Sequence, residues 1–166
     1  MKYVLIALLS VIWLTMGVPD YFSFPFGSWW LRATTYHFFH ANVFHLAINC
    51  IAILSVFDQK WWRKNLLGDF AIGYVIATLM YSTALTPIIG MSNILFAVFG
   101  LRTPSITSPW WRKKEVVVFL SLNLLMLAVP RISAMTHITS MLCGVAVAEL
   151  IRQTKRIGND YRRATQ

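Results

Sequence analysis

Apolar residues gather in six runs, separated by stretches that are polar, charged or interrupted by proline. None of the runs alternates with a period of two residues, and their lengths favour helices over strands. The pattern therefore predicts an all-α chain of six helices. They are expected at residues 3–18, 41–57, 70–86, 88–101, 116–129 and 133–151.

The composition places these helices in a membrane. The 166-residue chain is 57% hydrophobic and 13% charged, whereas a soluble domain is about 45–50% apolar and about 25% charged. So few charged residues cannot cover a water-facing surface of this size, which excludes a soluble globular domain and a disordered chain. Several runs are shorter than the ~20 residues of an ideal span, so neighbouring helices or a thin bilayer must compensate. We expect one polytopic membrane domain over residues 1–166.

The distribution of positive charge predicts the orientation. With six spans, one side of the membrane holds the N-terminus, two loops and the tail, which are residues 58–69, 102–114 and 152–166. Thirteen of the 15 Lys and Arg residues lie on that side, and two, Arg32 and Arg131, lie on the other. Because cytoplasmic loops carry the excess of Lys and Arg, both termini are expected in the cytoplasm, with residues 152–166 as a basic tail. The net charge of +9 is assigned to contact with lipid headgroups, and no nucleic-acid partner is expected.

Four polar side chains within the apolar runs fall at similar depth. His45 and Asn49 lie in the second predicted helix, Ser92 in the fourth and His137 in the sixth. Each lies in the N-terminal half of an even-numbered helix, and even-numbered helices start on the non-cytoplasmic side of this topology. Polar groups at membrane depth are costly, so each needs a partner or a function. The sequence therefore predicts a polar site on three helices in one leaflet.

The fourth predicted helix is short and central to this site. Residues 88–101 span about 21 Å at ~1.5 Å per residue, against a hydrocarbon core of ~30 Å. Its start near Ser92 must lie below the outer surface, enclosed by protein and reached by water. Backbone N–H groups at a helix start stabilise a developing negative charge.

Small residues at helical spacing predict that the fourth and sixth helices pack closely. Gly100 lies eight residues after Ser92, and Ser140, Gly144 and Ala148 follow His137 on one face. Close packing would bring Ser92 within hydrogen-bond reach of His137. A serine with a histidine base is the minimal pair for nucleophilic acyl transfer.

The joint pattern resembles the rhomboid family of intramembrane serine proteases over roughly residues 30–149. Arg32 precedes the second helix and is followed at family spacing by His40, His45 and Asn49. The nucleophile motif Gly-x-Ser-Gly corresponds to residues 90–93, with an aromatic residue at Phe96. The histidine motif of the last helix corresponds to residues 136–144.

The resemblance implies a six-helix rhomboid-like bundle that hydrolyses peptide bonds in or near transmembrane segments of membrane proteins. It implies Ser92 as nucleophile and His137 as base, and it implies an oxyanion site made by the Ser92 N–H with His45 and Asn49. Phe96 is expected to stack on His137, with Gly90, Asn93, His40, Gly144 and Arg32 in support. No metal or other cofactor is expected. A bacterial inner membrane is the expected location, and the substrate and oligomeric state are left open.

Three positions depart from the family pattern. Asn93 replaces the glycine after the serine, and Ser140 replaces the first glycine after the histidine. Rhomboid proteins carry a Trp-Arg pair before the second helix, but here Leu31 precedes Arg32, and Trp30 is one residue further away. Asn93 either obstructs the site or adapts to it and adds a hydrogen bond. Two functions other than proteolysis stay open. One is a catalytically inactive rhomboid pseudoprotease that binds transmembrane helices, and the other is a small haem- or ion-handling membrane protein that uses His40, His45 and His137.

Overall fold

The computed structural model describes residues 2–17, 28–58, 65–83, 89–102, 117, 121 and 134–164. All the regular structure in these ranges is helical. The elements are α1 (Lys2–Met16), α2 (Trp29–Thr35), the 3-10 helix η1 (Tyr36–Phe38), α3 (Val43–Asp58), α4 (Leu66–Thr83), α5 (Ser92–Leu101) and α7 (Ala134–Ala164). The predicted fifth helix, residues 116–129, lies outside the described residues except at two positions.

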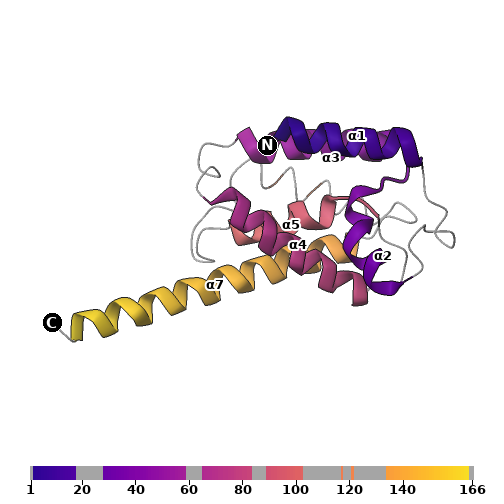
Figure 1. Ribbon diagram of the computed structural model, residues 1–166. Coiled ribbons are helices and arrows are strands. Elements are labelled where there is room, and N and C mark those ends of the chain that lie inside the picture. The colour runs from indigo at the N-terminus through magenta and orange to yellow at the C-terminus, as the bar shows by residue number, and fades with distance from the viewer. Residues whose placement is uncertain are drawn as a thin grey trace.

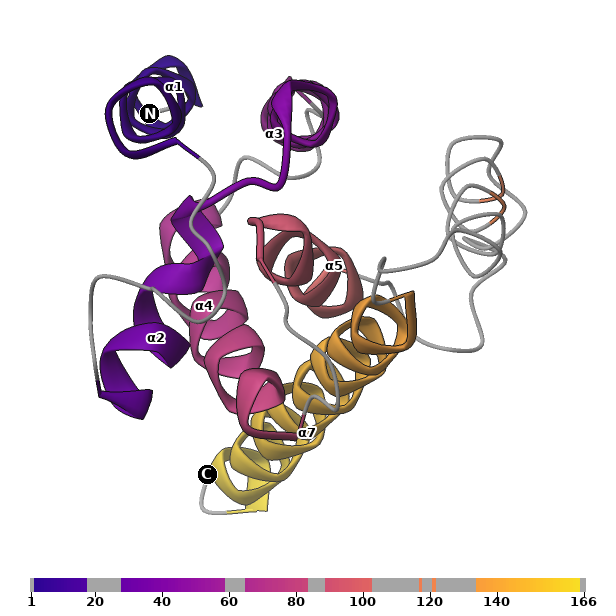
Figure 2. The ribbon, with the colours of Figure 1, turned by 90° about the vertical axis from the view of Figure 1, so that its right-hand side faces the viewer.

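The short helix α5 occupies the middle of the bundle. Figure 2 shows it between α3, α4 and α7, while α2 lies on the outer side of α4. Seven of the ten residues of α5 are buried, and Met91, Ile94, Leu95 and Val98 pack with residues of α1, α3 and α4 in the core. A segment this short can exist at the centre of the fold because other helices cover it on all these sides.

Glycines set the distance between α5 and α7. A Cβ atom on Gly100 would lie 2.0 Å from the carbonyl oxygen of Met141, and one on Gly144 would lie 2.2 Å from that of Ala97. The two backbones therefore touch at both glycines, which only residues without a side chain permit. This contact fixes the register of α5 against α7.

The helix ends differ from the predicted ones at α5 and α7. We expected the fourth helix to begin at residue 88, but α5 begins at Ser92, because Gly90 has φ of +107° and cannot continue a helix. We expected the last helix to end at residue 151, but α7 continues to Ala164. Arg152 ends the apolar run but does not end the helix, because no proline follows it in the chain. Arg152 also forms an ion pair with Glu149, one turn earlier on the same helix.

The segment before α3 contains structure that hydrophobic periodicity does not predict. Residues 29–38 form α2 and η1, in a stretch that we expected to be a loop. Ser28 caps α2 by accepting the N–H of Leu31, and Asn42 caps α3 by accepting the N–H of His45 through its side chain at 2.8 Å. Both are residue types that favour helix N-caps.

One described helix, Ala134–Arg163, is long and apolar enough by itself to cross a membrane. The pair Trp29–Phe38 and Val43–Leu54, bent by 73°, is a second candidate if the two helices form one span. The apolar helices α1, α4 and α5 are shorter. The described residues therefore establish an all-helical fold with one clear candidate span.

Candidate active site

Ser92 and His137 are brought together from helices 45 positions apart in the chain. The Oγ atom of Ser92 lies 2.7 Å from Nε2 of His137, a normal distance for a hydroxyl hydrogen bond. Ser92 is the first residue of α5, and His137 lies in the first turn of α7. The glycine contacts between α5 and α7 place these two helix starts side by side. The geometry permits the imidazole to take the hydroxyl proton.

The ring of Phe96 fixes the orientation of the His137 ring. The two rings are stacked, with centroids 4.6 Å apart and planes 3° apart. Phe96 lies one turn after Ser92 on the same face of α5, so one helix carries both the hydroxyl and the ring that contact His137. A stacked imidazole keeps its nitrogen directed at the serine hydroxyl.

Gly90 allows His45 to approach the turn that carries Ser92. A Cβ atom on Gly90 would lie 2.6 Å from Cε1 and 2.8 Å from Nε2 of the His45 ring. The backbone N–H of Ala41 donates to Nδ1 of His45 at 3.4 Å, which leaves the ring proton on Nε2. A side-chain donor therefore faces the backbone two residues before Ser92.

Tyr36 holds the same turn from both sides. Its carbonyl oxygen accepts the N–H of Gly90 at 3.0 Å, and its hydroxyl accepts a hydrogen bond from the side-chain amide of Asn93 at 3.5 Å. The hydroxyl in turn donates to the carbonyl oxygen of Ala77 on α4 at 2.8 Å. Ser92 therefore lies between two residues that are both bonded to one buried tyrosine.

Asn93 itself is fully buried in the first turn of α5. Asn65 is the one non-glycine residue of the described ranges with positive φ, so the backbone at Asn93 does not demand a glycine. The side chain that departs from the family pattern is engaged with η1 through Tyr36.

Asn49 is near this region but directed within its own helix. Its amide nitrogen donates to the carbonyl oxygen of His45 at 2.9 Å, and its buried Oδ1 has no hydrogen-bond partner among the described residues. The structure thus brings His45 to the Ser92 turn but leaves the Asn49 amide on α3. The first-turn N–H groups of α5 remain as backbone donors, because Met91 supplies no side-chain cap.

The remaining predicted residues surround this core at different distances. His40 is fully buried, and its ring lies edge-on to that of His45, with centroids 5.2 Å apart. Burial, with a smaller effect of His45, lowers the pKa of His40 to about 4, so its ring is neutral near pH 7. Arg32 lies on α2, where its carbonyl oxygen accepts the N–H of Tyr36. Gly144 acts at the α5–α7 contact, two turns beyond His137.

Sequence reasoning missed the aromatic cluster that supports the site. Tyr36 stacks on Tyr81 of α4 with ring centroids 4.8 Å apart, and His37 Nε2 lies 3.2 Å from the hydroxyl of Thr78. Tyr74 donates to the carbonyl oxygen of Thr34 at 2.7 Å. The run of aromatic residues and histidines at 36–40, just before a predicted helix, was the available signal.

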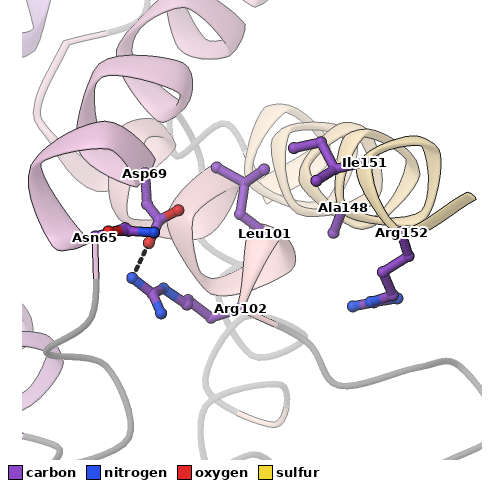
Figure 3. Close-up of a pocket in the computed structure, with 7 residues that line it drawn as sticks. All are labelled: Asn65, Asp69, Leu101, Arg102, Ala148, Ile151 and Arg152. Carbon is purple, nitrogen blue, oxygen red and sulfur yellow. Dashed lines mark ion pairs between the residues drawn. The ribbon is translucent and has the colours of Figure 1, made fainter. Parts of the chain in front are cut away.

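A pocket lies at the opposite end of α5 from Ser92. Figure 3 shows it between α4, α5 and α7, with an ion pair between Arg102 and Asp69 at its edge. Its volume is about 180 Å³, and its lining residues are Asn65, Asp69, Leu101, Arg102, Ala148, Ile151 and Arg152. It contains none of the predicted site residues. Across the described ranges, no group of three or more His, Cys, Asp or Glu residues is placed to hold a metal ion.

One of the three comparisons with known proteins gave a match. A search of curated proteins and a search of solved structures each returned no match. A family model described as the Rhomboid domain matches residues 27–154, which include α2 through most of α7 and every residue of the site described above. The chain therefore belongs to the rhomboid family.

Proposed function

We propose that this chain is an active intramembrane serine endopeptidase that cleaves peptide bonds in or near transmembrane segments. The observation that carries the proposal is the 2.7 Å contact between Ser92 Oγ and His137 Nε2. Rhomboid proteins are in general intramembrane serine proteases that act on transmembrane substrates in the bilayer. A nucleophile bonded to a base, with the base oriented by Phe96, is the arrangement that this chemistry requires.

In the proposed reaction, Ser92 attacks the scissile carbonyl carbon while His137 accepts the hydroxyl proton. His137 then gives that proton to the leaving amine, and water hydrolyses the acyl-enzyme by the same steps. The oxyanion receives hydrogen bonds from the Ser92 N–H and from Nε2 of His45. Asn49 joins them if its amide rotates from the His45 carbonyl oxygen when substrate binds. The chemistry uses no metal or cofactor.

The same proposal includes a six-span topology with both termini in the cytoplasm of a bacterial cell, in the inner membrane. Figure 1 supports it in one respect, because the N-terminus of α1 and the C-terminus of α7 lie at the same end of the bundle. The short α5 at the centre supports it as well, since Ser92 would then lie below the membrane surface within a ring of helices. The partners are the bilayer and transmembrane-segment substrates.

The alternative is a pseudoprotease that binds transmembrane helices without cleaving them. Asn93 favours it, because a side chain stands beside the nucleophile where the family pattern has none. Against it, Asn93 is accommodated by Tyr36, and the serine–histidine contact is intact. We therefore favour the active enzyme.

Cleavage of a transmembrane substrate by the purified protein in lipid vesicles tests the proposal. A fluorogenic substrate with one transmembrane segment should be cut by the wild-type chain and left intact by Ser92→Ala. Ser140→Ala is the matched control: Ser140 is a buried serine one turn after His137 on α7, and its hydroxyl has no hydrogen-bond partner among the described residues. Activity in Ser140→Ala and none in Ser92→Ala is the expected result, and equal activity in both would contradict it.

A further inference from the structure

The pocket at the far end of α5 contains none of the residues assigned to the proposed reaction. It has a volume of about 180 Å³ and lies where α4, α5 and α7 meet. These are the helices that pack most closely on one another in the described part of the chain. A ligand in this pocket would therefore contact all three helices at once, at the end of the bundle remote from Ser92.

Two arginines and one aspartate give the wall of this pocket a positive balance of charge. Arg102 of α5 pairs with Asp69 of α4 at its edge. Arg152 of α7 lies with Nη1 2.7 Å from Oε2 of Glu149, and Glu149 is not part of the wall. A guanidinium group has five N–H donors, so each arginine can bond its carboxylate and a further anion together. The wall therefore suits an anion better than a metal cation.

The other part of the wall is apolar. It consists of Leu101, Ala148 and Ile151, of which Ala148 is buried and Ile151 is 39% exposed. In the view of Figure 3, the guanidinium groups of Arg102 and Arg152 lie on one side of the pocket, below the side chains of Leu101 and Ile151. An inorganic anion would use the charged side alone, whereas a phosphate that carries an apolar group would use both.

The pocket also lies at the level where the helices change from apolar to polar. Ile151 is the last residue of the apolar run of α7, and Arg152 follows it directly. Leu101 and Arg102 make the same change at the end of α5, and Asp69 lies in the first turn of α4. In a helix that crosses a bilayer, this change marks the surface at which lipid phosphates lie. Basic pockets between membrane helices at this level bind the headgroups of anionic lipids.

We propose that this pocket binds the headgroup of an anionic glycerophospholipid. The phosphodiester accepts hydrogen bonds from Arg102 and Arg152, and the glycerol and the start of an acyl chain lie against Leu101 and Ile151. A zwitterionic headgroup would place an ammonium group beside two guanidinium groups, so an anionic headgroup is preferred. The inference is independent of the proposed proteolysis, because the pocket contains no residue of the candidate active site.

Native mass spectrometry of the full chain, transferred from detergent micelles with added phosphatidylglycerol, tests the role of Arg152. We expect one tightly bound lipid per wild-type chain, and an affinity about tenfold or more lower in Arg152→Gln, because a hydrogen bond to a charged group is lost. Glu149→Gln is the matched control, since it removes the same ion pair but keeps the arginine. It should bind the lipid at least as tightly as the wild type. Equal affinity in all three chains, or an equal loss in both variants, would overturn the proposal.

Filling the pocket without changing its charge tests the location. Ile151→Trp places a large side chain in the pocket wall, whereas Leu150→Trp changes a neighbouring residue that is 62% exposed and lies outside the wall. We expect the tightly bound phosphatidylglycerol to be lost in Ile151→Trp and kept in Leu150→Trp. Retention of the lipid in Ile151→Trp would place the lipid elsewhere on the protein and overturn the proposal.

The unfolding temperature separates a lipid from free phosphate as the occupant. A ligand that binds only the folded protein raises the unfolding temperature. In micelles of a neutral detergent, phosphatidylglycerol should raise it for the wild type and raise it much less for Arg152→Gln. Inorganic phosphate at matched ionic strength should leave it unchanged. An equal rise with inorganic phosphate alone, or no rise with phosphatidylglycerol, would overturn the assignment of a lipid to the pocket.

Discussion

The side-chain amide of Asn93 donates a hydrogen bond to the hydroxyl of Tyr36, across 57 positions of the chain. The same tyrosine accepts the N–H of Gly90 through its carbonyl oxygen. The residue that departs from the nucleophile motif of rhomboid proteins is therefore part of a brace that spans the Ser92 turn. In this chain the bulk of asparagine is used in packing and hydrogen bonding against η1.

Removing the Tyr36 hydroxyl tests whether this brace positions the nucleophile. Tyr36→Phe leaves the buried side-chain amide of Asn93 without the hydroxyl to which it donates, at a cost of about 1–3 kcal/mol. We expect kcat to fall about tenfold with a smaller change in KM. Tyr74→Phe is the matched control. It removes the hydrogen bond that the Tyr74 hydroxyl on α4 donates to the carbonyl oxygen of Thr34, and this bond does not involve the turn that carries Ser92. If both variants lose stability and activity in the same proportion, the brace is structural only.

Asn93→Gly restores the residue of the family pattern. Because Asn93 is fully buried and bonded to Tyr36, we expect unchanged or reduced cleavage of a generic transmembrane substrate. Glycine would also loosen the first turn of α5. A rise of about tenfold, equal to about 1.4 kcal/mol of barrier, from a nearly inactive parent would show that Asn93 blocks catalysis and that the pseudoprotease alternative is correct.

Gly144 tests the contact that places His137 beside Ser92. A Cβ atom there would lie 2.2 Å from the carbonyl oxygen of Ala97, so Gly144→Ala must push α7 away from α5, at a cost of about 1–3 kcal/mol. We expect a lower thermal unfolding temperature together with a loss of cleavage activity. Gly158→Ala provides the control on the same helix, because nothing lies within 4 Å of a Cβ atom at Gly158. That change should leave activity intact and raise helix stability slightly.

Asn49→Ala separates two roles for a buried amide. If Asn49 rotates to stabilise the oxyanion, turnover should fall about 10–1000-fold while the protein remains folded. The bond that the structure shows, from Asn49 to the carbonyl oxygen of His45 at 2.9 Å, is a local one within α3 whose loss should lower stability. Measurements of unfolding temperature and kcat on the same variant distinguish the two roles. If Asn49 only forms the hydrogen bond within α3, the unfolding temperature and kcat should decline together.

The sequence predicted which polar side chains come together at this site better than it predicted the contacts that support them. Ser92, His137 and His45 could be named because polar residues are rare in apolar runs, and rarity at membrane depth is informative. The packing of α5 on α7 could be anticipated because small residues at helical spacing are a direct signal of close approach. All of these inferences rest on positions along single helices.

What escaped prediction depends on contacts between distant segments. The brace at Tyr36 joins residues 36, 77, 90 and 93, and no periodicity marks such a set. The start of α5 moved from residue 88 to Ser92 because one glycine adopts positive φ, which hydropathy does not report. The length of α7 was underestimated for a related reason: charge ends a membrane-spanning segment but does not end a helix.

The most direct test of the account is whether Ser92 is a reactive nucleophile that depends on His137. A fluorophosphonate transfers its phosphonyl group to an activated serine hydroxyl and releases fluoride, so mass spectrometry can locate the adduct in the protein in lipid vesicles. We predict labelling of Ser92 in the wild-type chain, none in Ser92→Ala, and labelling slowed about 100-fold or more in His137→Ala, as expected for loss of a general base. An unlabelled Ser92 in the folded wild-type protein, or labelling at the same rate without His137, would contradict the account.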